Sequence, residues 1–366
     1  MKKIILVLSL FMLLTSACSS ATPALVEPPV ATAPPEVSST GLPKITPNPI
    51  PPAPTATPLS PQLAADLAVI TAANVSDLEK ITVLAGTNNR VTDLAFSADG
   101  AYLASTGYDE KIHLWDVTTW QEVYLFPCPE ADLNVIAFSP DAKLLASGQT
   151  VWDVASREVV QTFEPRLVEP AHVAFSPDGS QLAVVAAQKI KVWDVASWSQ
   201  MLSFDVPADS LWLFGISFSP DGKWLAAGAA QNGTVYFWSA ETGQLVSTLE
   251  QGNKNDVHDI AFSPDGTLLA TGGTDYFARI WSLAEKKELQ KISLIGMYSL
   301  ALSPDGTLLA TAGPERAVKL WDVQNGKMLR SLLHADELMA VAFSADGRLI
   351  AAGGYDNTIV IWGIPQ

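Results

Sequence analysis

The feature that most constrains the fold of this 366-residue chain is a phrase of about 40 residues that recurs seven times. Each copy has an apolar segment, a turn that reads Ser-Pro-Asp-Gly or close to it, a second apolar segment and a third that ends near a tryptophan. The residues directly before the turn serine are Phe96, Phe138, Phe175, Phe218, Phe262, Leu302 and Phe343. A repeat of this length predicts stacked structural units, because one unit cannot bury its apolar face alone.

Each copy is expected to form four short antiparallel strands. Pro and Asp occupy favoured positions of the turn after the first strand, and a weaker fourth strand follows the tryptophan, for example at residues 122–126. Four strands per copy and repeated Trp-Asp dipeptides are typical of a β-propeller blade. The region from residue 65 to the end therefore resembles the WD-repeat β-propellers. The resemblance implies an all-β fold with seven blades of four antiparallel strands.

The two ends of this region predict how the ring closes. The seventh copy stops at Gln366, shortly after its third strand, whereas residues 78–85 precede the first copy as an additional strand. In the family that the repeats resemble, an N-terminal strand completes the last blade, which removes an open sheet edge. We therefore expect residues 78–85 to be the fourth strand of the seventh blade.

The first residues have the pattern of a targeting signal. Lys2 and Lys3 precede an apolar run over residues 4–14, which is too short to span a membrane. Small residues then lead to Cys18. This arrangement resembles a bacterial lipoprotein signal, which implies that Cys18 is lipidated and becomes the first residue of the mature protein. The alternative is an ordinary secretory signal in which Cys18 has no special role.

A proline-rich segment separates this signal from the repeats. It holds 13 of the 25 prolines of the chain, between Cys18 and Pro61, and shows no hydrophobic period. Such a composition favours an extended spacer over a folded core. We therefore predict a signal peptide at residues 1–17, a disordered tether at residues 18–64 and a propeller at residues 65–366. The expected location is the bacterial cell envelope, outside the cytoplasm, with a lipid anchor.

Charge and cysteine content exclude several classes of protein. The formal net charge of −16 opposes binding to nucleic acid and to anionic lipid headgroups. Membrane association is therefore expected only through the lipid anchor, and a protein partner is expected to present a basic surface. Cys18 and Cys128 are the only cysteines, too few for a disulfide framework or a cysteine metal site. The expected state is a monomer.

The resemblance to WD-repeat proteins also implies a hydrogen-bonded tetrad of Asp, His, Ser or Thr, and Trp in a typical blade. Three copies keep most of it: Ser105, Asp109 and Trp115 in the first, Thr271, Asp275 and Trp281 in the fifth, and His334, Asp356 and Trp362 in the seventh. Thr87 and Asn253 stand at the histidine position of the first and fifth copies. The pair His334 and Asp356 has two interpretations, a catalytic pair or a buried structural pair, and the repeat register favours the second.

The sequence contains no motif for enzymatic chemistry. It has no paired cysteines, HExxH sequence, glycine-rich phosphate loop or Gly-x-Ser-x-Gly elbow. The aspartates of the Ser-Pro-Asp-Gly turns belong to separate repeats, so we interpret them as turn residues rather than calcium ligands. We therefore predict a protein that is not an enzyme and needs no cofactor and no metal.

The second copy departs from the seven-fold pattern. Trp152 follows Ser147 by five residues, whereas Trp115 follows Ser105 by ten. The loop between its second and third strands is therefore nearly absent, which predicts a notch in the rim. Cys128 lies just before this copy, and we expect a buried thiol there rather than a reactive one.

Large aromatic residues are a second irregularity. Trp120 and Trp198 are expected in turns between third and fourth strands, and Trp224 near a turn between first and second strands. At the other strand ends, where the family commonly contacts partners, the sequence places Tyr108, Trp212, Tyr276, Met297 and Tyr355. Solitary surface aromatics are ordinary, but several on one rim would form a contact surface. We predict that these five residues bind a protein partner.

The favoured function is therefore a non-catalytic protein-interaction scaffold outside the cytoplasm. An alternative is a propeller enzyme or small-ligand binder that uses the central channel, where Asp93, His172 and Asp259 lie near the starts of first strands. A sensor ectodomain is a third class, although the sequence shows no second apolar membrane segment.

Overall fold

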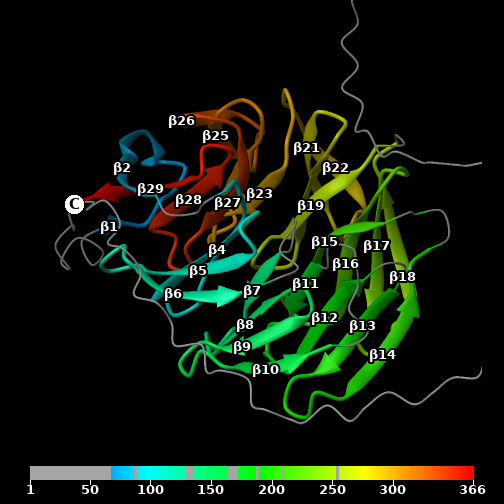
Figure 1. Cartoon of the computed structure of the whole chain (residues 1–366). Coiled ribbons are helices and arrows are strands. Elements are labelled where there is room, and N and C mark those ends of the chain that lie inside the picture. The colour runs from blue at the N-terminus through cyan, green and yellow to red at the C-terminus, as the bar shows by residue number, and fades with distance from the viewer. Residues whose placement is uncertain are drawn as a thin grey trace, which may run out of the picture. The chain divides into compact units, whose positions relative to one another are not determined.

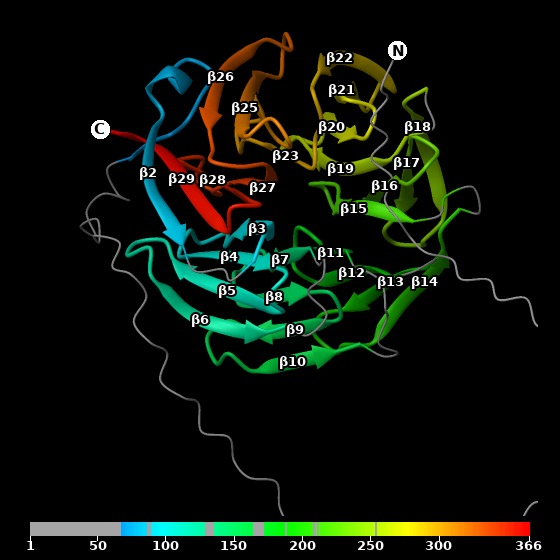
Figure 2. The ribbon, with the colours of Figure 1, turned by 45° about the horizontal axis from the view of Figure 1, so that its top comes forward.

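The computed structural model describes residues 67–85, 89–128, 135–163, 172–186, 189–207, 210, 212–252 and 255–366. Within these ranges 29 strands and one short 3-10 helix form seven antiparallel sheets that follow one another around a ring (Figure 1). The predicted fold, an all-β propeller of seven blades, is confirmed. Each blade has four principal strands, which we letter a to d from the centre outwards, and the a strands lie nearest the centre in Figure 2.

The blades follow the order of the chain. Blade 1 consists of β3 (Val91–Phe96), β4 (Tyr102–Gly107), β5 (Lys111–Asp116) and β6 (Glu122–Pro127), and blade 2 of β7 (Ile136–Phe138), β8 (Leu144–Ser147), β9 (Thr150–Asp153) and β10 (Val159–Thr162). Blade 3 consists of β11 (His172–Phe175), β12 (Gln181–Ala186), β13 (Lys189–Asp194) and β14 (Gln200–Asp205), and blade 4 of β15 (Leu213–Phe218), β16 (Trp224–Ala229), β17 (Thr234–Ser239) and β18 (Leu245–Glu250).

The remaining blades complete the ring. Blade 5 consists of β19 (Val257–Phe262), β20 (Leu268–Gly273), β21 (Phe277–Ser282) and β22 (Lys287–Ser293), and blade 6 of β23 (Ser299–Leu302), β24 (Leu308–Ala312), β25 (Ala317–Asp322) and β26 (Met328–Leu333). Blade 7 combines β27 (Leu338–Phe343), β28 (Leu349–Gly354) and β29 (Thr358–Pro365) with β2 (Glu79–Ala85) from the N-terminal side.

Antiparallel strand order gives each blade two ends. The a–b and c–d turns lie at one end, which we call the turn face and which includes Asp99 and Trp120. The b–c loops and d–a connections lie at the other end, the loop face, which includes Tyr108 and Tyr355. The two faces therefore carry different parts of every repeat.

The a–b turn has the same internal hydrogen bond in every blade. In blade 1, Ser97 Oγ donates to Asp99 Oδ1 over 2.6 Å and accepts the N–H of Tyr102 over 2.9 Å. Gly100 at the end of this turn has a φ of +72°, which glycine adopts without a Cβ clash. The serine-to-aspartate bond recurs in the other six blades at 2.6–2.7 Å. The interpretation of these aspartates as turn residues is therefore confirmed.

The core is divided into seven apolar clusters, each between two neighbouring blades. The strand c tryptophans are their largest members, and Trp152 and Trp238 are each only 2% exposed. Burying such a side chain removes a large apolar area from water. Cohesion between blades therefore comes mainly from these interfaces.

The N-terminal strand closes the ring as predicted. β2 pairs antiparallel with β29 from Glu79 opposite Gly363 to Ala85 opposite Thr358. The structure adds a second pairing that we did not predict, because β1 (Leu67–Ala68) pairs with the extended end of β29, at Pro365 and Ile364.

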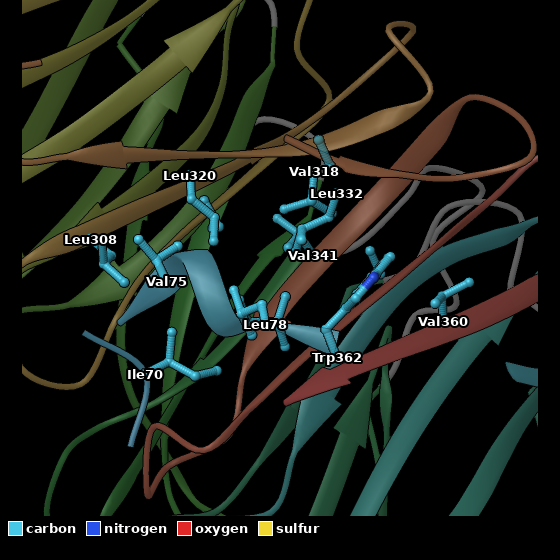
Figure 3. Close-up of a cluster of buried hydrophobic side chains, with 14 of the residues drawn as sticks. Ile70, Val75, Leu78, Leu308, Val318, Leu320, Leu332, Val341, Val360 and Trp362 are labelled. Atoms are coloured by element: carbon cyan, nitrogen blue, oxygen red, sulfur yellow. The ribbon is translucent and has the colours of Figure 1, made fainter. Parts of the chain in front are cut away.

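Between these two strands the chain crosses from one side of blade 7 to the other. Leu67 belongs to the cluster between blades 7 and 1, whereas Ile70, Val75 and Leu78 belong to the cluster between blades 6 and 7, where they point toward the side chains of both blades (Figure 3). The 3-10 helix η1 (Val75–Asp77) lies in this segment. We call residues 67–78 the strap.

Polar contacts hold the strap to both blades. The N–H of Ile70 donates to the carbonyl of Gly347 in the a–b turn of blade 7 over 2.8 Å. Arg330 of β26 in blade 6 donates to the carbonyls of Ser76 and Leu78, the latter over 3.1 Å. The strap therefore connects blades 6 and 7 in addition to the strand exchange that closes the ring.

Candidate functional site

Two tyrosines of neighbouring blades meet an arginine on the loop face. Tyr108 follows β4 in blade 1, and Tyr355 follows β28 in blade 7. The guanidinium carbon of Arg90 lies 4.2 Å from the ring centroid of Tyr355 and 5.9 Å from that of Tyr108. Both distances allow a cation–π attraction. Arg90, which sequence reasoning missed, thus links the two rings.

The same surface extends to blade 6. Tyr298 precedes β23 and is 38% exposed, and partial burial, with the nearby Tyr355 and Glu337, raises the pKa of its hydroxyl. Ile295 in the same connection is 71% exposed, and its N–H donates to Glu315 Oε1 over 2.9 Å. An exposed isoleucine whose backbone is held in this way is a candidate for contact with another molecule. We call Arg90, Tyr108, Tyr298 and Tyr355 the aromatic cluster.

A second pair of aromatics lies on the loop face of blades 4 and 5. Trp212 precedes β15 and is 45% exposed, and Tyr276, in the b–c loop of blade 5, is 59% exposed. The carbonyl of Trp212 accepts the N–H of Ala230 over 2.9 Å, which fixes its backbone to the b–c loop of blade 4. Both side chains are available to a partner from separate blades.

Met297 belongs to the interior, in contrast to the prediction that it contacts a partner. Its side chain is 2% exposed and packs in the cluster between blades 5 and 6. A Cβ at Gly272 would lie 2.1 Å from its Cε, so the side chain fills space that the glycine leaves empty. The neighbouring Tyr298 occupies the surface position instead. Sequence alone does not separate two adjacent large residues in one connection.

The tryptophans of the c–d turns lie on the turn face, where the sequence places them, but they are not free surface groups. Trp120 packs against the cluster between blades 7 and 1, and Trp198 against that between blades 2 and 3. Trp224, at the start of β16, is 40% exposed. Only the last of these three is a candidate for contact with another molecule.

The tetrad residues of blade 1 form a network that includes an unpredicted histidine. Trp115 Nε1 donates to Ser105 Oγ over 3.0 Å. His113, on the same strand as Trp115, lies with Nε2 2.8 Å from Asp109 Oδ2 and with Nδ1 against Glu122. Burial opposes protonation of His113, but the hydrogen bonds to the two carboxylates outweigh it and raise its pKa. His113 is therefore a partner of Asp109 in place of a histidine from the d–a connection.

Blade 5 repeats this arrangement with an arginine. Trp281 Nε1 donates to Thr271 Oγ1 over 3.0 Å, and Arg279 lies 2.5 Å from Asp275 Oδ2 and 2.9 Å from Glu288 Oε2. The Arg279 side chain is 1% exposed, and a buried cation is tolerated only when it is paired in this way.

Blade 6 has the same arrangement of a tryptophan, a hydroxyl, a cation and an acid, which sequence reasoning missed. Trp321 Nε1 donates to Thr311 Oγ1 over 2.9 Å, and Lys319 Nζ pairs with Glu315. In these three blades the cation stands two residues before the tryptophan and four after the acid. That spacing is visible in the sequence and was the available signal.

The seventh blade has a looser version of the tetrad. His334 Nδ1 lies 3.5 Å from Asp356 Oδ2, and burial lowers the pKa of His334. Its Nε2 is buried without a hydrogen-bond partner. Trp362 lies in the core between blades 6 and 7. The backbone N–H of Asp336 also donates to His334 Nδ1, over 3.4 Å, so the pair is part of the connection between blades 6 and 7.

The aspartates near the centre of the ring join neighbouring blades. Asp93 Oδ2 accepts the N–H of Ile136 in blade 2 over 2.8 Å, and Asp259 Oδ2 accepts the N–H of Leu300 in blade 6 over 2.9 Å. Burial raises the pKa of Asp93 to about 7 and that of Asp259 to about 6. Burial also lowers the pKa of His172 to about 4. One oxygen of each aspartate therefore serves a contact between two blades.

The short hairpin of blade 2 is present as predicted. Gly148, with a φ of +56°, and Gln149 alone connect β8 to β9. Cys128 is buried at 4% exposure, with Sγ 3.9 Å from Ser147 Oγ. The expectation of a buried thiol is therefore confirmed.

Several predicted residues lie outside the described ranges. These are Cys18, the tether at residues 18–64, and the tetrad positions Thr87 and Asn253. Among the residues that the structure does describe, no helix has the length and apolar character needed to cross a membrane, and no group of three or more His, Cys, Asp or Glu side chains is placed to hold a metal ion.

Comparison with curated proteins finds relatives that share the repeats. The chain is 29% identical over 226 residues to WD repeat-containing protein 18 of Danio rerio, covering 54% of this chain and 51% of that protein. It is 24% identical over 217 residues to periodic tryptophan protein 2 of Arabidopsis thaliana, covering 57% and 24%. It is 26% identical over 219 residues to eukaryotic translation initiation factor 3 subunit I of Aspergillus terreus, covering 55% and 64%. The matches span between about a quarter and two thirds of these relatives.

The family described as WD domain, G-beta repeat matches residues 78–116, 201–239, 243–282, 293–322 and 326–363, about half of the chain. The first of these stretches begins at β2, so it joins the closing strand of blade 7 to the first three strands of blade 1. Blades 2 and 3 lie largely outside the matched stretches and still form four strands each. The seven blades, the strand exchange and the five matches together show that this chain belongs to the WD-repeat family.

Proposed function

We propose that this protein is a non-catalytic interaction module, anchored by lipid outside the cytoplasm, whose loop face binds another protein. The observation that carries the proposal is the aromatic cluster, in which Arg90 lies between the rings of Tyr108 and Tyr355. Tyrosine and arginine are enriched among residues that dominate binding energy at protein interfaces. A preformed cluster also loses little side-chain freedom on binding.

Charge supports a partner with a basic surface. Glu315 and Glu337 stand beside Ile295 and Tyr298 on the same face, and the whole chain carries a formal net charge of −16. Such a surface accelerates encounter with a positively charged partner and repels nucleic acid.

The channel alternative has less support from the geometry. The oxygens of Asp93 accept the N–H groups of Leu94 and Ile136, and those of Asp259 accept the N–H groups of Ile260 and Leu300. Carboxylates engaged in this way hold the inner strands together. A substrate would have to displace bonds that stabilise the ring.

The loop-face proposal is tested by retention of envelope proteins on the immobilised full chain. Tyr108→Ala combined with Tyr355→Ala should reduce retention of the principal partner by roughly thirty-fold in affinity, because truncating an interface aromatic can cost about 2 kcal/mol. The matched control is Met201→Ala with Met328→Ala, two residues that are 50% and 52% exposed on outer strands. Melting temperatures of both variants should equal that of the parent. Equal loss with both pairs, or with neither, would refute the assignment of the loop face.

The anchor is tested separately. Labelled palmitate should enter the wild-type protein and not Cys18→Ser, because stable anchoring requires acyl chains attached to this cysteine. The variant should leave the membrane fraction while its propeller melts at an unchanged temperature. Secretion of both forms as soluble protein would show that Cys18 belongs to an ordinary signal.

A further inference from the structure

One position of the c–d turn has a left-handed backbone in blades 1 to 6. It lies five residues after the strand c tryptophan and is occupied by Trp120 (φ +55°), Arg157 (+66°), Trp198 (+54°), Gly243 (+69°), Lys286 (+51°) and Gly326 (+68°). A residue with a Cβ costs about 1 kcal/mol in this conformation. Contacts of a large side chain at this position must therefore offset that cost.

In three blades the side chain at this position closes the groove toward the preceding blade. Trp120 packs into the cluster between blades 7 and 1. The ring centroid of Trp198 lies 6.1 Å from that of Phe163 in blade 2, and the guanidinium carbon of Arg157 lies 4.8 Å from the ring centroid of Tyr124 in blade 1. The groove is thus filled from the c–d turn.

In the two blades with glycine the preceding blade supplies the filling side chain. A Cβ at Gly243 would lie 2.6 Å from the ring of Phe204 in blade 3. Beside Gly326, Gln290 of blade 5 donates from Nε2 to the carbonyl of Gln324 over 2.8 Å. Blade 7 has no c–d turn, because its fourth strand, β2, comes from the N-terminal side of the chain. In the groove between blades 6 and 7 the strap packs instead.

The groove between blades 4 and 5 has neither kind of filling side chain. It also has aromatic walls, unlike the hollows of about 280 and 500 Å³ between blades 2 and 3 and between blades 5 and 6. Lys286 is exposed at the turn position, and the preceding blade has the small Ser247 where blade 1 has Tyr124. A pocket of about 360 Å³ remains between the two neighbouring blades. Its apolar walls are formed by Phe237, Leu249, Phe262 and Leu283. The volume is at the small end of the range for ligand pockets.

The walls of this pocket correspond to those around a tryptophan elsewhere in the ring. By position in the repeat, they match the members of the blade 7 and 1 cluster against which Trp120 packs, namely Ile361, Leu84, Phe96 and Val117. Between blades 7 and 1 these walls pack around the indole of Trp120, whereas between blades 4 and 5 the equivalent walls enclose no indole. An aromatic side chain from outside matches its shape and polarity.

The rim favours a cation beside that aromatic group. Hydrogen bonds from Ser219 lower the pKa of Asp221 to about 2, and those from Ser263 lower the pKa of Asp265. Both carboxylates line the pocket. Lys223 pairs with Asp221 over 2.9 Å, whereas no cation among the described residues pairs with Asp265, which leaves Asp265 for a cation of the partner. Trp224, which is 40% exposed, stands at the same edge.

We propose that this groove binds a tryptophan side chain of another protein, in a segment that also carries lysine or arginine. Residues 12–66 of this chain contain no aromatic residue, so the N-terminal segment cannot supply one after Cys18. The site lies on the turn-face side of the molecule and is independent of the aromatic cluster on the loop face. Loss of either site leaves the other intact.

The test uses the full chain and a blocked peptide of sequence Gly-Arg-Trp-Lys-Gly with a fluorinated indole, observed by fluorine NMR. The wild type should bind it at least about tenfold more tightly than the same peptide with glutamate at both basic positions. A peptide with alanine in place of tryptophan, observed by calorimetry, should show no binding. Lys286→Trp should abolish binding, because its indole fills the groove as Trp120 does, and should keep or raise the melting temperature.

A second variant fills the groove without changing the c–d turn, so that an effect of altering the turn is distinguished from an effect of filling the groove. Ser247→Tyr fills the groove from blade 4 and should also abolish binding, whereas Glu285→Trp, on the exposed neighbouring residue, should leave it unchanged. Binding of the peptide to Lys286→Trp and to Ser247→Tyr as to the wild type would overturn the proposal. So would equal binding of the alanine peptide by the wild type, or no binding by the wild type. If the wild type self-associates and Lys286→Trp does not, the occupant of the groove is a second copy of this chain. That result would refute a separate partner protein.

Discussion

The two faces of the propeller differ in how closely they keep the repeat. On the turn face, all seven a–b turns carry the same serine-to-aspartate hydrogen bond at 2.6–2.7 Å. On the loop face, the b–c loops differ in length and sequence, from two residues in blade 2 to four in blades 4 and 6. Repetition therefore marks residues that build a blade, and departure from repetition marks candidates for contact with other molecules.

Each face also has a feature that does not follow this pattern. The groove beside Lys286 is a departure on the turn-face side, and the pair of Asp275 and Arg279 is a structural element near the loop face. Four experiments test how residues of the closing strand and of the two faces contribute to stability.

The largest effect is expected from removing the N-terminal closure. A chain starting at Thr87 lacks the strap, which includes β1, and also lacks β2, so blade 7 exposes the edge of β29. Such an edge is a template for association. This chain should melt much lower and associate in sedimentation experiments, whereas a chain starting at Ala65 should behave as the full protein. A chain starting at Leu78, which keeps β2 alone, should be intermediate. Identical melting of all three would show that the closure contributes nothing.

Arg279→Leu tests whether the ion pairs of blade 5 near the loop face stabilise the fold. The change leaves the carboxylates of Asp275 and Glu288 without their cation, which should lower the free energy of unfolding by about 3 kcal/mol. Lys191→Leu is the matched control, because it changes the same strand position in blade 3. Urea unfolding measures both. An equal cost for the two variants would remove the special role of the blade 5 network.

The pH dependence of stability should show opposite contributions from the two kinds of aspartate. Burial raises the pKa of Asp93 to about 7, so the folded chain holds more protons than the unfolded chain between about pH 4 and 7, and unfolding free energy falls as pH rises through that window. Hydrogen bonds lower the pKa of Asp141 to about 2, so its contribution is lost as pH falls below about 4. Asp93→Asn should flatten the slope above pH 4, while Asp141→Asn should change only the acid limb. An unchanged slope in Asp93→Asn would contradict the assignment.

The smallest effect is expected in a single turn. Ser176→Ala removes the donor to Asp178 and the acceptor for the N–H of Gln181, which should cost about 1 kcal/mol. Ser180→Ala, which also bonds Asp178 but is exposed, should cost less. Thermal unfolding measures the difference, and retention of the loop-face partner should not change in either variant. Loss of that retention would show that the faces are coupled.

The blade count, the strand order and the closing strand follow directly from the repeat, because each copy carries its own turn signal, apolar segments and tryptophan. Met297 shows the limit of the same reasoning. It was expected on the loop face because its connection lies there, but one residue separates a buried side chain from the exposed Tyr298. The direction of a side chain in an irregular connection depends on what packs against it.

The sequence by itself determined that the chain forms a seven-bladed WD-repeat propeller closed by its own N-terminal strand, since that information is local and repeated. Only the tertiary structure decided that Arg90 joins Tyr108 to Tyr355, that the strap packs between blades 6 and 7, and that the groove beside Lys286 stays open. Each of these depends on side chains from different blades that meet only when the ring closes. Contacts between blades have no fixed spacing in the chain, so the repeated sequence pattern does not predict them.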